Sequence, residues 1–307
     1  MRAPGALSSA RSYLLVRRVN PKTVTCLTDK SNRVITFTSD FGSSDGYVGI
    51  VKGVIKSINH NAHVIDLSHE IKSFQISTAA WIIYNAYNYF PPDSIHLVVV
   101  DPGVGADRRG VILSQPGAIF VGPDNGVFSL IVQDPLGKRS SAKDGHSELK
   151  AFELAKESHY YPSVSSTFHA RDVFARVVAH LSSDLHGSIF KKFATPIDVD
   201  SLIIDKHSKF ERTAAGIRGK VAHVDHFGNL ITSIPATEVT PEAIVSINQH
   251  RIGSVGTTYH SVAKGDLVAI RGSHGFLEIA ACEARADEAT GGELGSDVIV
   301  EVPSPNQ

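Results

Sequence analysis

Three aspartates that follow short apolar runs are the first residues that could do chemistry. Asp40, Asp66 and Asp101 each end a predicted strand. In open parallel sheets, ligands bind beyond the carboxyl ends of the strands. Carboxylates there suit the hydroxyls of a sugar or an ammonium group, although each could instead cap the helix that follows. Three such acids together favour a ligand site over three unrelated caps.

A second cluster begins at Asp101, in a turn with one proline and two glycines that runs into Arg108 and Arg109. Either arginine could hold the Asp101 carboxyl in its ionised form. His169 is expected near a helix N-terminus, where the helix dipole favours a neutral imidazole that can accept a proton. Taken alone, His169 would be an ordinary surface or capping residue, so its interpretation depends on the other residues.

The conspicuous polar stretch of the second half is 223–232. Its turn could be a plain hairpin, or it could present Asp225, Phe227 and Asn229 to a ligand. His223 and Asp225 share one strand face and His226 lies on the other, which argues against a metal site. No GxGxxG pattern and no P-loop motif occurs, so the sequence does not predict a dinucleotide or P-loop site.

The predicted secondary-structure elements that position these residues differ between the two halves of the chain. In the first half, strands alternate with helices, which predicts a parallel sheet covered on both faces. The expected strands are 34–38, 63–65, 95–100, 110–114 and 118–121, and the expected helices are 47–58, 75–88, a short one from 126, and 171–181. The second half has short strand-like runs at close spacing, typical of a small antiparallel barrel or sandwich. These are 217–224, 230–234, 243–248, 267–271, 276–280 and 298–302.

The sequence therefore predicts an α/β fold in two domains. An N-terminal parallel-sheet α/β domain is expected at 32–192, a linker at 193–212, and a C-terminal small antiparallel β-barrel domain at 213–304. The length of 307 residues suits two domains. The formal net charge of −1 argues against a nucleic-acid or anionic-membrane binder, and no apolar run reaches the roughly 18 residues of a membrane span.

Residues 1–31 form an N-terminal extension that is rich in arginine and has no acid before Asp29. This composition fits either a disordered tail or an organellar transit peptide. We expect a cytoplasmic protein, or a mitochondrial or plastid one if residues 1–28 are a transit peptide. Cys26 and Cys282 stand far apart and form no metal or redox motif.

Six short motifs in one order carry a family resemblance that spans about 34–302. They are Ser39-Asp40-Phe41-Gly42, Asp101-Pro102-Gly103-Val104-Gly105, Pro123-Asp124-Asn125-Gly126, Phe168-His169-Ala170-Arg171-Asp172, Asp225-His226-Phe227-Gly228-Asn229 and Gly275-Phe276-Leu277-Glu278-Ile279-Ala280. Together they resemble the S-adenosyl-L-methionine (SAM) hydroxide adenosyltransferases, or SAM hydrolases, relatives of the fluorinase and chlorinase.

The resemblance implies a metal-independent enzyme that takes SAM as its substrate, needs no cofactor and releases adenosine and L-methionine. It also implies a homotrimer with SAM held at subunit interfaces. The catalytic set of the hydrolases falls on Asp101, Arg108 and His169. The substrate-binding positions fall on Asp40 for the ribose hydroxyls, Phe74 beside the ribose, Asp45 and Asp225 for the ammonium, Phe227 and Asn229 for adenine, and Ser273 for the carboxylate.

Two positions depart from the relatives. Ala170 stands where the fluorinase has its halide-binding serine and the hydrolases usually have glycine, which disfavours halide chemistry. His274 stands where the fluorinase has arginine beside the substrate carboxylate. Two other functions stay open at this point: an adenosyl halogenase of the same fold, and a non-catalytic SAM or adenosine sensor. The identity of the group that takes the proton, Asp101 or His169, is also open.

Overall fold

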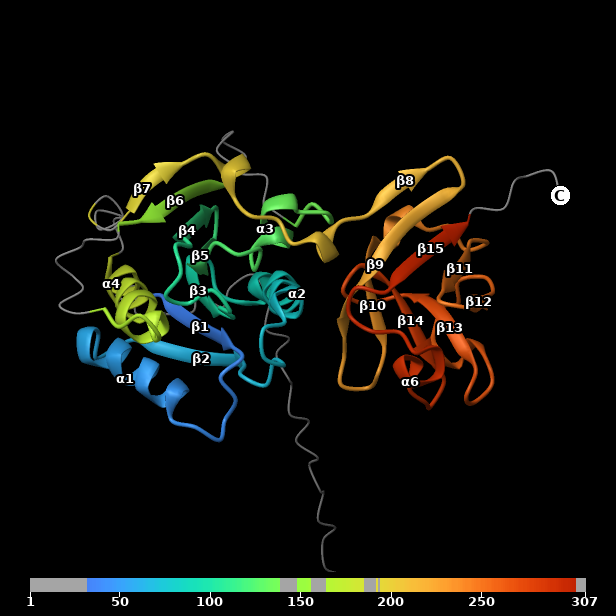
Figure 1. Ribbon diagram of the computed structural model, residues 1–307, viewed down its shortest axis with the longest axis horizontal. Coiled ribbons are helices and arrows are strands. Elements are labelled where there is room, and N and C mark those ends of the chain that lie inside the picture. Colours follow the sequence, from blue (N-terminus) through green and yellow to red (C-terminus); the bar gives the residue numbers. More distant parts are fainter. Residues whose placement is uncertain (1–31, 139–147, 156–163, 185–191, 193, 302–307) are drawn as a thin grey trace, which may run out of the picture. The chain divides into compact units, whose positions relative to one another are not determined.

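The computed structural model describes residues 32–138, 148–155, 164–184, 192 and 194–301 (Figure 1). The expected N-terminal extension, 1–31, lies outside the described residues. Within the described part, one sheet forms in each half of the chain. No helix in this part is long and apolar enough to span a membrane.

Among the described residues, the first sheet has seven strands in the order β2–β1–β3–β5–β4–β6–β7. The pairings from β2 to β5 are parallel and those from β5 to β7 are antiparallel. The strands are β1 (Val34–Ser39), β2 (His63–Ser68), β3 (Ser94–Val99), β4 (Gly110–Gln115), β5 (Ala118–Pro123), β6 (Lys150–Leu154) and β7 (Ala194–Ile197). Because β2 and β3 flank β1 on opposite sides, the loops after β1 and β3 open a crevice at the carboxyl ends of the strands.

Helices cover both faces of the parallel half, as the strand–helix alternation predicted (Figure 1). The side chains of β3 show why, because Leu97 and Val99 enter one hydrophobic core while Val98 enters the other. One face carries α1 (Tyr47–Ile58) and α4 (Ala175–Ser183), and the other carries α2 (Ile76–Ala86) and α3 (Ser129–Gln133).

The second sheet is antiparallel throughout and nearly closed, which confirms the predicted barrel-like fold. In the described chain its strand order is β12–β11–β15–β9–β10–β14–β13, and β8 pairs with β9. The strands are β8 (Glu211–Thr213), β9 (Gly216–Val224), β10 (Leu230–Pro235), β11 (Ile244–Ile247), β12 (His250–Ile252), β13 (Leu267–Arg271), β14 (Phe276–Ala281) and β15 (Asp297–Glu301). Gly256, just after β12, donates a backbone hydrogen bond of 2.8 Å to Ala269 of β13, so the two edges of the sheet meet. A short helix, α6 (Ala286–Thr290), follows β14.

The structure corrects one strand boundary that bears on the site. Asp66 does not end β2, because the strand continues to Ser68 past an irregularity in its pairing with β1. Asp40 directly follows β1, and Asp101 comes two residues after β3. Of the three aspartates, only Asp40 and Asp101 therefore lie beyond a strand end.

Strands β6, β7, β8 and β12 were not predicted from the sequence, for a physical reason. They are short and carry charged residues or proline, and β7 contains Pro196 at the edge of the first sheet, where proline is tolerated. Strand β7 and the 3₁₀ turns Val199–Ser201 and Lys206–Ser208 occupy part of the stretch that the sequence suggested as a linker.

The helix predicted at 171–181 begins with an irregular turn. Residues Ala170–Phe174 form one π-helical turn that continues into α4. The backbone N–H groups of Arg171 and Asp172 both donate to the Phe168 carbonyl, at 3.1 Å each. Such turns are frequent at functional sites, and His169 stands directly before this one.

Candidate active site

A cavity of about 270 Å³ opens at the carboxyl ends of β1 and β3. It brings together Asp40 from the loop after β1, Asp101 from the loop after β3, and His169 from the start of the π-helical turn. The other lining residues are Phe41, Tyr47, Ser73, Phe74, Val99, Val104, Thr167, Phe168 and Ala170. The cavity thus lies at the position where the strand order predicts a ligand.

Arg108 joins Asp101 and His169 into one hydrogen-bonded set. Its Nε donates to both oxygens of the Asp101 carboxylate at 3.0 Å, and its Nη2 contacts Oδ2 of the same carboxylate. The same Nη2 lies 2.9 Å from Nδ1 of His169. The side chains of Asp101 and Arg108 are only 5% and 12% exposed, so solvent screens this ion pair weakly. Of this set, Asp101 and His169 line the first cavity, and Arg108 and His169, together with Arg109, line a neighbouring cavity of about 240 Å³.

The turn after Asp101 places Arg108 against the carboxylate. Val104 N donates to the Asp101 carbonyl at 3.2 Å and Ala106 N to the Gly103 carbonyl at 3.0 Å. Gly105 has φ of +81°, and a Cβ there would lie 2.2 Å from the Ser166 carbonyl oxygen. Only glycine fits this close approach, which brings the turn next to the segment that carries His169.

The hydrogen bonds show which nitrogen of the neutral His169 ring carries the hydrogen. A guanidinium can only donate, so Nδ1 accepts from Arg108 and the hydrogen of the neutral ring sits on Nε2. Burial first, and then the positive charge of Arg108, lower the pKa of His169 below its ordinary value. The neutral ring therefore offers Nε2–H as a donor.

Arg109, the other arginine considered for Asp101, has a different role. Its Nε and Nη2 donate to the buried Asp124 carboxylate at 2.9 and 2.5 Å, and Nη2 also donates to the Ser201 carbonyl at 2.6 Å. It braces the loop before β4 against the end of β5 and contributes no bond to Asp101.

Asp40 and Phe74 lie at the same cavity and contact each other. Oδ2 of Asp40 accepts the backbone N–H of Phe74 at 3.0 Å. Phe74 has φ of +71° and its side chain is 69% exposed, an unfavourable state for a large side chain. The predicted acid Asp45 is exposed in the loop before α1 and does not line this cavity.

Three other predicted residues gather on the second sheet, around a cavity of about 660 Å³. The Asp225 carboxylate organises the turn between β9 and β10: Oδ1 accepts Phe227 N and Asn229 N, and Oδ2 accepts Asn229 Nδ2, all at 2.9 Å. A carboxylate can only accept, so the Asn229 amide must turn its nitrogen to Asp225, which leaves its oxygen as an acceptor. The Phe227 ring is 71% exposed.

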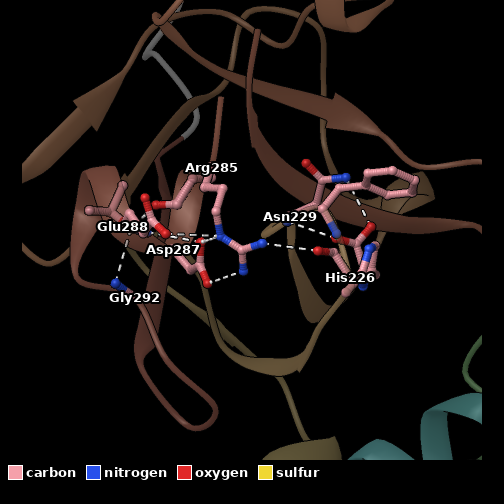
Figure 2. Close-up of polar contacts among 10 residues, drawn as sticks. His226, Asn229, Arg285, Asp287, Glu288 and Gly292 are labelled. Carbon is pink, nitrogen blue, oxygen red and sulfur yellow. Dashed lines mark hydrogen bonds and ion pairs between the residues drawn. The ribbon is translucent and has the colours of Figure 1, made fainter. Parts of the chain in front are cut away.

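Arg285, directly before α6, supports this turn (Figure 2), although no sequence pattern singled it out. Its Nη1 donates to the His226 carbonyl at 2.9 Å, and its Nε and Nη2 donate to Asp287 at 3.1 and 2.8 Å. Gly228 has φ of +86°, and a Cβ there would lie 2.4 Å from Asp287 Oδ1. An arginine among acids at a short helix looks like an ordinary surface pair in sequence, so no local signal marked it.

Ser273 and His274 occupy the tight turn between β13 and β14. Ser273 is exposed and does not line the second cavity. His274 Nε2 lies 3.0 Å from Oε2 of the buried Glu278, and Tyr259 donates to Oε1 of the same carboxylate at 2.8 Å. In the part of the chain that the structure describes, no three His, Cys, Asp or Glu side chains are arranged to hold a metal ion.

Comparisons with known proteins agree over both halves. The chain matches the family models described as SAM hydroxide adenosyltransferase N-terminal domain, over residues 35–189, and C-terminal domain, over 219–299. It is similar to the protein named (R)-S-adenosyl-L-methionine hydrolase of Methanocaldococcus jannaschii, with 35% identity over 261 residues, 80% of this chain and 87% of the relative. A protein of the same name from Thermus thermophilus is 34% identical over 267 residues, 87% of this chain and 98% of the relative.

A more distant relative and a solved structure extend the comparison. A protein named fluorinase from Actinoplanes sp. is 23% identical over 246 residues, 72% of this chain and 78% of the relative. The crystal structure of an uncharacterized conserved protein from Thermotoga maritima superposes with a TM-score of 0.74 at 30% identity and covers 88% of this chain and 100% of that chain.

Proposed function

The chain belongs to the SAM hydroxide adenosyltransferase family, and we propose that it hydrolyses SAM at ribose C5′ to give adenosine and L-methionine. One observation carries the proposal: Asp101, Arg108 and His169 form a single hydrogen-bonded set, and two of its members, Asp101 and His169, line the same cavity as Asp40. The set can orient and deprotonate a water molecule, and Asp40 can bind a sugar next to it.

The substrate explains why so few groups are needed. When the C5′–S bond breaks, both of its electrons go to the sulfonium sulfur, which leaves as a neutral thioether and needs no proton. The water oxygen forms the new bond to C5′ and then loses one proton. Attack on a cation by a neutral or anionic oxygen disperses charge, so a site with little water favours the reaction.

The hydrogen bonds support a separate role for each of the residues His169, Asp101 and Arg108. Nδ1 of His169 is already bonded to Arg108, so the ring holds the water through Nε2–H. The Asp101 carboxylate retains acceptor capacity beside its bonds to Arg108, and it takes the proton as the C–O bond forms. Arg108 keeps both groups in register and stabilises the hydroxide character of the nucleophile.

Asp40 and Phe74 provide the ribose end of the site. Oδ2 of Asp40 is engaged by Phe74 N, which leaves Oδ1 to accept from the two hydroxyls of a ribose diol. The exposed Phe74 ring lies at the same cavity and gives the sugar an apolar contact.

The turn on the second sheet provides the adenine end. The free acceptor oxygen of Asn229 suits the 6-amino group of adenine, which donates hydrogen bonds. The exposed ring of Phe227 offers a stacking surface for a purine. Besides the ammonium contact proposed below, Asp225 has a structural part, because its bonds hold Asn229 in the orientation that adenine needs.

The methionine end and the assembly belong to the same proposal. Asp45 and Asp225 would accept the substrate ammonium, and Ser273 would donate to its carboxylate. The ribose residues and the adenine residues line two different cavities. Separate cavities suit a substrate shared between subunits, and, as the family resemblance implies, we propose a homotrimer in which each SAM contacts the first sheet of one subunit and the second sheet of a neighbour.

Incubation of the purified protein with SAM in ¹⁸O-labelled water tests the reaction directly. Hydrolysis at C5′ places the label in the 5′-hydroxyl of adenosine and releases unlabelled L-methionine, both detected by mass spectrometry. Parallel incubations with chloride or fluoride detect a 5′-halogenated adenosine if the protein is a halogenase. Intact SAM in every incubation, with tight binding of SAM, would identify a sensor instead.

A further inference from the structure

Strand β1 carries two hydroxyl–imidazole pairs that look alike but have different surroundings. Thr36 Oγ1 lies 2.8 Å from His96 Nδ1, and Ser39 Oγ lies 2.7 Å from His69 Nδ1. His96 is fully buried and stacks on Phe120 at 5.1 Å, and burial lowers its pKa to about 3. This first pair is part of the core, whereas Ser39 immediately precedes Asp40 at the cavity.

His69 holds the loop after β1 at two points. Its carbonyl accepts Gly42 N at 2.8 Å, and its Nδ1 contacts Ser39 Oγ, which also lies 3.4 Å from Phe41 N. Its ring packs edge-on against the buried Phe37 at 4.7 Å. Asp40 thus lies between Ser39 and Gly42, which are both hydrogen-bonded to His69.

Asp66, the aspartate that the proposed reaction leaves without a role, lies behind the same ring. His69 Nε2 is 3.0 Å from Asp66 Oδ1, an ion-pair distance that does not meet hydrogen-bond geometry, and Lys52 Nζ is 2.5 Å from Oδ2. Burial opposes ionisation of Asp66, but the bonds from Lys52 and His69 outweigh it and lower the pKa of this carboxyl. The ring nitrogen beside an ionised carboxylate carries the hydrogen, so in the neutral ring Nδ1 accepts the Ser39 hydroxyl.

Through these contacts His69 can control the orientation of the Asp40 carboxylate at the candidate ribose site. The Asp40 carboxylate must keep one oxygen on Phe74 N and offer the other to the sugar. Phe74 sits in the left-handed region, which a phenylalanine adopts only when its surroundings enforce it. If the loop after β1 loosens, the Asp40–Phe74 bond loosens with it and the carboxylate no longer points at the cavity in a fixed orientation.

We propose that His69, acting through Ser39 and the Gly42 backbone, is a positioning residue for Asp40 and thereby sets the affinity for the ribose of the substrate. The inference rests on the proposed function for the identity of that ligand. It assigns the Asp66–His69–Ser39 contacts to substrate binding, and not to the chemical step at Asp101.

Steady-state kinetics and adenosine calorimetry test the inference with matched variants. In His69→Phe, which keeps a ring against Phe37, and in Ser39→Ala, we expect KM for SAM and Kd for adenosine to rise about tenfold while kcat stays within about twofold. His69→Asn, whose short amide can still reach Ser39, should recover most of the affinity.

The core pair on the same strand supplies the control. Thr36→Val and His96→Phe remove an equivalent hydroxyl–imidazole contact, so they should lower the melting temperature and leave KM unchanged. Unchanged KM in both His69→Phe and Ser39→Ala, or an equal rise in Thr36→Val, would overturn the inference.

Hydrogen exchange on the ligand-free protein separates this inference from the proposed function. Peptides that cover 39–46 and 69–75 should exchange faster in His69→Phe than in the wild type, with no change elsewhere on β1. If the wild type leaves SAM intact, the proposed function fails, and the exchange rates with adenosine affinity still decide the role of His69. Unchanged exchange in both peptides would refute the positioning role whatever the activity.

Discussion

Replacement of Arg108 by lysine is the sharpest test of the catalytic set, because it keeps the positive charge but removes the planar guanidinium that bonds to Asp101 and His169 together. The guanidinium reaches both oxygens of Asp101 and Nδ1 of His169 at once. A lysine ammonium on a flexible chain is a point charge that cannot hold the two partners in one plane. We expect Arg108→Lys to retain the fold and lose turnover.

The size of the loss follows from the bonds that disappear. Lysine can keep one contact to Asp101, so one charge-assisted bond to Asp101 and the bond to His169 are lost. Such bonds contribute about 1.5–3 kcal/mol each. Without these bonds the set must be aligned in the transition state at a cost of about 3 kcal/mol, taking the lower value for each bond, which lowers kcat by about 10²-fold.

Arg109 provides a matched control one residue away. It makes a similar ion pair with the buried Asp124 carboxylate, but its other bonds go to Ser201 and not to Asp101 or His169. Arg109→Lys should therefore lower the melting temperature without changing turnover per folded molecule. The assay is adenosine release from SAM, corrected for the folded fraction by thermal melting, and SAM affinity is measured separately by calorimetry.

Two results would refute this reasoning. One is that Arg108→Lys and Arg109→Lys lower stability alike while both keep wild-type turnover, which would make the Asp101–Arg108 pair structural. The other is that Arg108→Lys and His169→Ala reduce kcat in a strictly additive way, because residues that act as a unit are non-additive. His169→Ala alone should reduce kcat by about 10²-fold.

Three further predictions follow from the site. Because burial and Arg108 lower the pKa of His169, turnover should persist as the pH falls through 6.5, the ordinary histidine value, and decline only below it; an acidic limb above 6.5 in a pH–rate profile would contradict this. Asp40→Ala should weaken adenosine binding by about 1.5 kcal/mol or more, roughly tenfold, in calorimetry, and an unchanged affinity would remove Asp40 from the site. Adenosine should bind at least about tenfold more tightly than inosine, whose 6-oxo group cannot donate to Asn229, and Asn229→Ala should abolish most of that difference; equal discrimination in the variant would refute the role of Asn229.

Much of the fold was predictable from residue patterns, because the strong signals are local. The run 95–100 is apolar on both faces and became β3, a strand buried in two cores. The alternating runs of the second half became the strands of one antiparallel sheet within one or two residues. The weak edge strand β7 was missed because Pro196 and its exposed neighbours carry no strand signal.

The candidate site was predictable as a set of residues but not as an arrangement. Motif order pointed to Asp101, Arg108 and His169, and the structure brings them into one hydrogen-bonded set. Either of the two adjacent arginines could face Asp101 on sequence alone. The backbone conformation of the turn at Gly105 decides that it is Arg108, and residue types do not reveal that conformation. The part of Arg285 in bracing the adenine-side turn likewise arises from a contact across 59 positions of sequence.

The sequence by itself determined the two sheets, the residue types of the site and the class of chemistry, because apolar periodicity and short motifs act over a few neighbouring residues. The tertiary structure alone decided which atoms meet. It placed the His169 hydrogen on Nε2 through Arg108, turned the Asn229 amide through Asp225, and moved Asp66 from a strand end to a position behind His69. Hydrogen-bond direction is a property of atoms in space, and it appears only when distant segments pack against one another.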